Sequence, residues 1–252
     1  MKNAYIDFHC HILPGMDFDG TDDLKESVAM CTTLKSQGVA TVCATPHFYP
    51  WNDDVDEFLA RRAETYEKLA AAGGDIEIIL GAEVQIFKSL ADYPVDKMCI
   101  GDSNVVMLEM PRLPYADWMF TAIENTVYKY HLIPVIAHIE RYGYSKATIK
   151  KLATLPNVFF QISVDELDRK SAIKTLDTIC SCGVPVVLGS DAHNTIERAP
   201  HFDIVSEKLK VRAGFFDKSL KTTQAIIENC LFAAPILEEY IRKKVKKATE
   251  VK

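Results

Sequence analysis

The chain has 252 residues, of which 48% are hydrophobic and 25% are charged, a balance typical of globular proteins and unlike disordered or fibrous chains. Its apolar runs are only strand-sized, so we expect no membrane insertion. The formal net charge of −6 argues against nucleic-acid binding as the main role.

Short apolar runs alternate with longer amphipathic stretches along the chain, a pattern that indicates strands and helices in turn. Most of the short runs are continuously apolar, as in parallel strands that are covered on both faces. Strands are predicted at residues 4–8, 39–45, 76–80, 105–109, 133–136, 158–162 and 184–189. Helices are predicted at about 22–37, 55–72, 118–130, 145–154, 166–182 and 204–247, with a short one at 89–92.

Right-handed crossovers between parallel strands leave two common closures, an open doubly wound sheet or a barrel. The sequence contains no GxGxxG or Walker A loop, which weakens the nucleotide-binding form of the open sheet. We find no linker or internal repeat and therefore expect a single domain over residues 1–252. The basic residues near the end, at 242–247, are expected on the solvated face of a terminal helix.

The first residues enter a strand pattern directly, without a signal-peptide pattern. Seven cysteines, an odd number, lack the spacing of a disulfide framework. We therefore expect reduced thiols and a cytoplasmic location.

Metal-binding side chains follow most of the predicted strands. The first strand ends in His9-Cys10-His11, where alternation points both imidazoles to one side and Cys10 into the core. Five of the seven histidines lie at strand ends, whereas His131 is expected to be structural and His201 to lie at the surface. The strand-end candidates are His9, His11, His47, Glu83, Glu109, His138, Asp191 and His193. In a parallel barrel these ends meet on one face, which predicts a functional site.

Imidazole and carboxylate groups together favour zinc, manganese or iron, whereas calcium and magnesium sites prefer oxygen alone. With Asp17 or Asp19 from the first loop, the candidates are too many for one ion. At three or four ligands per ion, the candidate residues suit two or three divalent ions. The alternative is a buried, hydrogen-bonded cluster without a cation, which would be electrostatically costly.

Two arginines lie close to candidate ligands in the sequence: Arg141 follows His138, and Arg198 follows His193. Guanidinium groups bind phosphate in a bidentate manner, so arginines at a metal face suggest a phosphoryl substrate. The alternative for each arginine is a surface ion pair.

Five motifs together resemble the PHP (polymerase and histidinol phosphatase) superfamily. They are HCHILPG at 9–15, TPH at 45–47, GAE at 81–83, AHIERY at 137–142 and SDAHN at 190–194. Within it, the HCHILPG and AHIERY segments resemble the CpsB/CapC-type manganese-dependent protein tyrosine phosphatases of capsule and exopolysaccharide systems. The resemblance implies a distorted seven-stranded TIM-like (β/α) barrel, a metal centre built from the candidate ligands, and phosphate binding by Arg141 and Arg198. In this chain Phe18 separates Asp17 from Asp19, so the loop ligand is either one.

The implied reaction is hydrolysis of phosphotyrosine on a protein, such as a bacterial tyrosine kinase, by hydroxide at a two- or three-metal centre. Mn²⁺ is the expected metal, with iron or zinc as alternatives. A metal-site aspartate or histidine is the candidate for any general acid. No cysteine has an arginine six positions later, so cysteine-dependent phosphatase chemistry is not expected. Three rivals remain: a small-molecule phosphatase such as one acting on histidinol phosphate, a different metal hydrolase, and a catalytically silent metal-stabilised scaffold.

Overall fold

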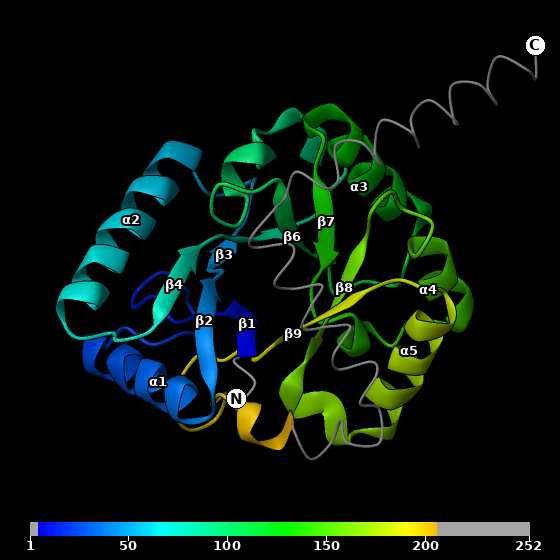
Figure 1. Ribbon diagram of the computed structural model, residues 1–252. Coiled ribbons are helices and arrows are strands. Elements are labelled where there is room, and N and C mark those ends of the chain that lie inside the picture. Colours follow the sequence, from blue (N-terminus) through cyan, green and yellow to red (C-terminus); the bar gives the residue numbers. More distant parts are fainter. Residues whose placement is uncertain (1–4, 206–252) are drawn as a thin grey trace, which may run out of the picture.

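The computed structural model describes residues 5–205, an α/β arrangement in which the paired strands run parallel (Figure 1). One sheet has the order β1 (Tyr5–Cys10), β2 (Val39–Ala44), β4 (Glu77–Leu80). The other has the order β3 (His47–Phe48), β5 (Glu83–Gln85), β6 (Val105–Glu109), β7 (Ile133–Ile136), β8 (Phe159–Ser163), β9 (Val186–Gly189).

Two of the predicted strands are each followed, after a gap of two residues, by a short strand that the sequence analysis does not predict. β2 and β3 are separated at Thr45 and Pro46, because proline has no backbone N–H to donate to the ladder. β4 and β5 are likewise separated at Gly81, where an added Cβ would lie 2.9 Å from the Ile100 side chain. At both gaps the chain therefore leaves the first sheet, which contains β2 and β4, and enters the second sheet, which contains β3 and β5.

The remaining junction lies between β9 and β1. The residues just beyond β9 form a single parallel bridge between Ala192 and Cys10, and the His11 N–H donates to the Ala192 carbonyl at 2.9 Å. Asp7 on β1 reinforces this junction, since its carboxylate accepts hydrogen bonds from the backbone and the hydroxyl of Ser190 at 2.8 and 2.6 Å. The paired strands among residues 5–205 thus form two parallel sheets that one isolated bridge links at this junction, and not one continuous closed sheet.

Helices lie around the outside of the strands (Figure 1). They are α1 (Leu24–Ser36), α2 (Val55–Ala71), α3 (Asp117–Tyr130), α4 (Lys146–Leu152) and α5 (Lys170–Ser181). Short 3-10 helices are η1 (Leu90–Asp92), η2 (Val95–Met98), η3 (Ile139–Tyr142), η4 (Val164–Asp168) and η5 (Phe202–Ile204). Side chains of Asp23, Asp54 and Ser145 accept hydrogen bonds from backbone N–H groups at the starts of α1, α2 and α4, which explains where these helices begin.

The strands and helices predicted within residues 5–205 are present, with differences at their ends, and the structure adds the unpredicted short strands β3 and β5. The helix predicted at 166–182 begins only at Lys170, because η4 occupies the preceding residues. The terminal helix predicted at 204–247 and the basic residues at 242–247 lie almost wholly outside the described part of the chain. Within residues 5–205, no helix combines the length and apolarity needed to span a bilayer. The six cysteines in this range are free thiols.

Candidate metal centre

The first group of site residues surrounds the end of β1. His9 and His11 are fully buried, and their Nε2 atoms lie 3.0 Å apart. Glu83 Oε2, at the start of β5, lies 3.2 and 3.4 Å from these two nitrogens. Asp191 Oδ1, just beyond β9, lies 3.5 and 3.3 Å from them. Four candidate ligands, from the segments at the ends of β1 and β9 and at the start of β5, therefore converge on one point.

Glu83 connects this first group to a second one. Its Oε1 lies 2.9 Å from His138 Nε2, and its Oε2 lies 3.0 Å from His47 Nδ1. Glu109 Oε1 lies 3.9 Å from the same His138 nitrogen. Glu83 thus occupies the middle of the cluster and faces histidines on both sides.

A third group lies on the other side of His11. His193 Nε2 and His47 Nε2 lie 3.4 and 3.7 Å from Asp19 Oδ1. The imidazoles of His11 and His193 stack with their centroids 3.8 Å apart. All eight strand-end candidates therefore belong to one continuous cluster.

The two aspartates of the first loop have different positions. Asp17 Oδ2 lies 3.1 Å from His11 Nδ1, on the ring nitrogen that faces away from the cluster centre, and Asp17 Oδ1 accepts the His47 backbone N–H at 2.6 Å. Asp19 instead faces the Nε2 atoms of His47 and His193. Asp17 is therefore placed to orient a histidine, and Asp19 is placed among the inward-facing donors.

Three histidines have their Nδ1 atoms held by oxygen acceptors. His9 Nδ1 lies 3.1 Å from Gln161 Oε1, His11 Nδ1 lies 3.1 Å from Asp17, and His193 Nδ1 donates to the Asp191 carbonyl at 2.9 Å. Because these oxygens only accept, Nδ1 carries the proton and Nε2 presents its lone pair to the cluster. This is the usual way in which a protein fixes the tautomer of a metal-binding histidine.

The donor set fits divalent cations. Two ligands on one ion, each at about 2.1 Å, lie about 3.0–3.4 Å from each other, which matches the spacing around Glu83. Glu83 Oε2 nevertheless has no partner with hydrogen-bond geometry, and the same is true of His193 Nε2 and Asp19 Oδ1, although all three atoms are buried. A cluster satisfied by its own hydrogen bonds would not leave these atoms unpartnered. The residues therefore have the properties of a metal centre, as the sequence predicts.

The ionisation states of the cluster residues also favour a bound cation. Burial opposes ionisation, yet the neighbouring imidazoles lower the pKa of Glu83 and of Asp191 well below the usual values. Burial lowers the pKa of His193 to about 4, so this histidine is neutral at pH 7. Against the effect of burial, the carboxylates raise the pKa of His9 and His11, so the field favours positive charge at the centre.

The backbone at two site residues adopts the left-handed conformation. His138 has a φ of 26° and Asp191 a φ of 52°, in a region that disfavours residues other than glycine. Such strained positions concentrate at functional sites, where the surrounding structure holds them in place.

The two predicted phosphate-binding arginines lie at the edge of the cluster. Arg141 Nη1 and Arg198 Nη2 both bond to Asp191 Oδ2, the latter at 2.8 Å, and Arg198 Nη1 bonds to Asp19 Oδ2 at 2.8 Å. Both line a pocket of about 290 Å³ that opens over the site. Their ion pairs are therefore made with site carboxylates.

Sequence reasoning missed three residues of this site. Gln161 holds His9, and its signal was a lone amide in the apolar run of β8. Arg112 and Tyr142 line the 290 Å³ pocket; Tyr142 ends the AHIERY motif, which was a signal for it, whereas nothing in the sequence context of Arg112 separates it from ordinary loop residues. Cys10 is buried away from the cluster and His201 is exposed, both as predicted, while His131 forms the C-cap of α3.

The two parallel sheets with their helices and the buried histidine–carboxylate cluster define a metal-binding α/β protein. Residues 5–223 match the family model described as "Capsular polysaccharide synthesis, CpsB/CapC", and the chain belongs to this family.

Similar proteins include two tyrosine-protein phosphatases. YwqE of Bacillus subtilis is 31% identical over 143 residues, which is 54% of this chain and about half of YwqE. CpsB of Streptococcus pneumoniae is 25% identical over 81% of this chain and 90% of its own. A solved structure from a study of YwqE and CpsB, described there as metal-dependent tyrosine phosphatases, matches with a TM-score of 0.72 and 24% identity over 92% of this chain and 94% of its own, which shows the shared fold.

Proposed function

We propose that this protein is a metal-dependent protein tyrosine phosphatase of a capsular or exopolysaccharide system. The observation that carries the proposal is the position of Arg141 and Arg198, which line one pocket with the histidine–carboxylate cluster. Family membership and the names of the relatives support the same activity. The substrate is a phosphotyrosine protein, with a bacterial tyrosine kinase as the candidate, and the free cysteines support a cytoplasmic location.

The cluster would hold two or three divalent ions, with Mn²⁺ preferred over iron or zinc. Asp19 is the loop ligand, because it faces His47 and His193, whereas Asp17 orients His11. The proposed ligands are His9, His11, Asp19, His47, Glu83, Glu109, His138, Asp191 and His193. When bound, such ions polarise phosphoryl oxygens and lower the pKa of water.

The arginines bind and orient the phosphoryl group. Both guanidinium groups line the pocket, where they pair with Asp191, and the planar N–H fork of a guanidinium group matches two phosphoryl oxygens. These contacts strengthen as negative charge builds on the phosphoryl group, so they favour the transition state over the ground state. The leaving group is a phenol with a pKa of about 10, which needs less protonation than an alkoxide.

A substrate comparison tests the proposal. After removal of metal with a strong chelator, hydrolysis of a phosphotyrosine peptide should be lost, and Mn²⁺ should restore it better than Mg²⁺, because five histidines supply nitrogen donors that Mg²⁺ accepts poorly. The peptide should be a better substrate than histidinol phosphate. Preference for histidinol phosphate would replace the proposal by a small-molecule phosphatase, and no turnover of either with added metal would leave a silent scaffold.

A further inference from the structure

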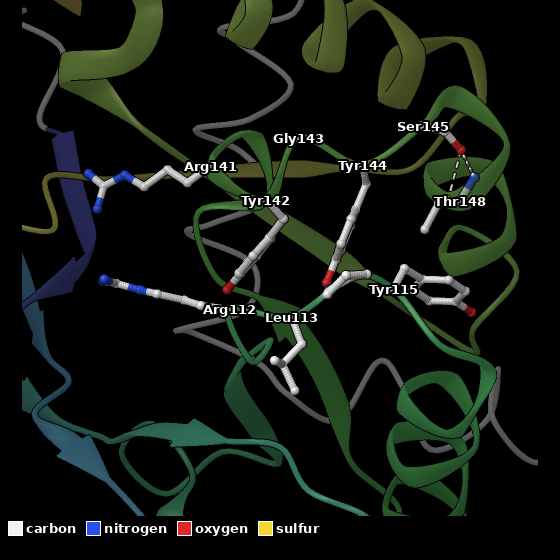
Figure 2. A pocket seen from close by; sticks show the side chains of 10 residues that line it. Arg112, Leu113, Tyr115, Arg141, Tyr142, Gly143, Tyr144, Ser145 and Thr148 are labelled. Atoms are coloured by element: carbon white, nitrogen blue, oxygen red, sulfur yellow. Dashed lines mark hydrogen bonds between the residues drawn. The ribbon is translucent and has the colours of Figure 1, made fainter.

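A second, larger cavity adjoins the pocket over the metal cluster. It has a volume of about 620 Å³, within the range of about 300–1,000 Å³ typical of ligand sites. Two loops line it, residues 112–115 after β6 and residues 141–148 around and after η3 (Figure 2). Arg112, Arg141 and Tyr142 line both cavities, so the two cavities lie side by side.

One wall of this cavity is a row of aromatic rings that begins at the metal cluster. The ring centroid of Tyr142 lies 5.4 Å from that of His138. The Tyr142 ring also stacks on the Tyr144 ring, with a centroid distance of 5.2 Å and an angle of 19° between the ring planes. Tyr144 in turn meets Tyr115 edge to face at 5.7 Å. Figure 2 shows the Tyr142 and Tyr144 rings side by side, with Leu113 near them. This wall suits an aromatic or large apolar side chain.

Arg112 stands at the junction of the two cavities. Figure 2 shows its side chain extending to the same side as that of Arg141. Unlike Arg141 and Arg198, which pair with Asp191, the guanidinium of Arg112 has no hydrogen-bond or ion-pair partner among residues 5–205. A cation without an acidic partner beside the phosphate pocket is available to an anionic group of a ligand.

Exposed apolar side chains concentrate on the same face of the molecule. Within the described part of the chain, the large hydrophobic residues that are exposed are Phe18, Trp51, Leu113 and Ile196. Each lies on a loop that follows the C-terminal end of a strand, namely β1, β3, β6 and β9. Leu113, which is 60% exposed, lines the tyrosine-walled cavity itself. Of these four residues, Leu113 alone lines the cavity, so it is the one that a ligand bound there would contact.

We propose that the tyrosine-walled cavity is a subsite for the residue next to phosphotyrosine in a polypeptide substrate. The subsite takes a large apolar or aromatic side chain, and Arg112 pairs with a carboxylate of the same segment. This inference rests on the proposed phosphotyrosine activity and adds a sequence preference to it. Leu113 and Arg112 are specificity-determining residues, whereas the phosphoryl group stays in the adjoining pocket.

The test is a comparison of kcat/KM on phosphotyrosine peptides that differ only beside the phosphotyrosine. The wild type should favour a phenylalanine neighbour over alanine by about tenfold, the scale on which apolar pockets discriminate. Leu113→Ser should reduce this ratio, mainly through KM. Ile196→Ser, which alters a side chain that is 84% exposed outside the cavity, is the matched control and should keep the ratio.

A charge reversal tests the role of Arg112. The wild type should favour a glutamate neighbour over lysine, and Arg112→Glu should invert this preference, which a merely structural role would not do. An equal loss on all peptides would assign Arg112 to the phosphoryl group and overturn its part in the subsite.

Phenyl phosphate separates failure of this inference from failure of the proposed function. Equal kcat/KM for all peptides in the wild type would overturn the subsite while the phosphatase activity stands. Hydrolysis of phenyl phosphate without hydrolysis of any phosphotyrosine peptide would overturn the proposed protein substrate. The wild-type series is decisive even if a variant does not fold.

Discussion

At the scale of single residues, the site depends on what lies behind each histidine as much as on the histidines themselves. His9 and His11 are fixed by Gln161 and Asp17, which leaves both Nε2 atoms facing inward. The same Gln161 oxygen also accepts the backbone N–H of His138, so one amide positions residues of two strand ends.

Gln161→Leu should therefore weaken metal binding by about 10- to 100-fold, the usual effect of removing a residue that orients a metal ligand. The measurement is a metal titration of the chelator-treated protein, followed by elemental analysis. Gln161→Glu keeps an acceptor for His9 and should retain more affinity than the leucine variant. Equal affinity in the wild type and the leucine variant would show that His9 needs no such anchor.

Substitutions of Arg141 and Arg198 should distinguish phosphate binding from metal binding. Arg141→Ala and Arg198→Ala should each lower turnover of phosphotyrosine by about 100-fold or more, the scale of losing one oriented donor, while metal content persists. Lysine at either position should rescue only partly, because it keeps the charge without the planar fork. By contrast, His138→Ala should lose metal and activity together. Near-normal rates in both alanine variants would exclude the arginines from phosphate binding.

At the scale of the elements, the junction of β1 and β9 sets the geometry of the centre. Gly189 ends β9, and a Cβ at this position would lie only 2.5 Å from the His9 Cβ and 2.9 Å from Gln161 Nε2. The absence of a side chain therefore lets β9 approach the histidine strand and brings Asp191 to His9.

Gly189→Ala should force these strands apart, with a loss of stability and of metal binding together. Gly183→Ala is the control, because its left-handed φ of 71° costs strain of about 1 kcal/mol while nothing lies within 4 Å of the added Cβ. Thermal unfolding and metal content of the two variants check the prediction. Similar behaviour of both variants would show that backbone strain, rather than the close approach, is what matters.

At the scale of the whole molecule, a buried carboxyl beside the site makes stability depend on pH. Burial raises the pKa of Glu140 to about 7, and its Oε2 has no hydrogen-bond partner in the described residues. In the unfolded chain the same group titrates near 4.5. Between these values the folded state binds more protons, so the free energy of unfolding falls as the pH rises towards 7.

Glu140→Gln removes this buried charge and should raise the stability at pH 8, by up to about 3 kcal/mol, with little change at pH 4.5. Unfolding in denaturant at the two pH values measures the difference. A glutamine variant less stable than the wild type at pH 8 would mean that the Glu140 carboxylate contributes favourably, for example through Arg141, whose Nε lies 3.9 Å from it.

Much of the molecule could be read from its sequence, because strand periodicity and the residues at strand ends are local signals. The short strands β3 and β5, which follow Pro46 and Gly81, are absent from the predicted elements, because they depend on how neighbouring strands meet. The separation of roles between Asp17 and Asp19 and the pairing of both arginines with Asp191 depend on side-chain directions in a loop. Periodicity carries no information about such directions.

The central claim is that the strand-end cluster is a metal centre that hydrolyses phosphotyrosine. The most direct measurement is a titration of metal-free protein with Mn²⁺, in which bound metal and turnover of a phosphotyrosine peptide are recorded on the same samples. Turnover should be absent without metal and should rise with occupancy to a plateau at two or three ions per chain. Full turnover in metal-free protein, or saturated metal binding without turnover, would contradict the account.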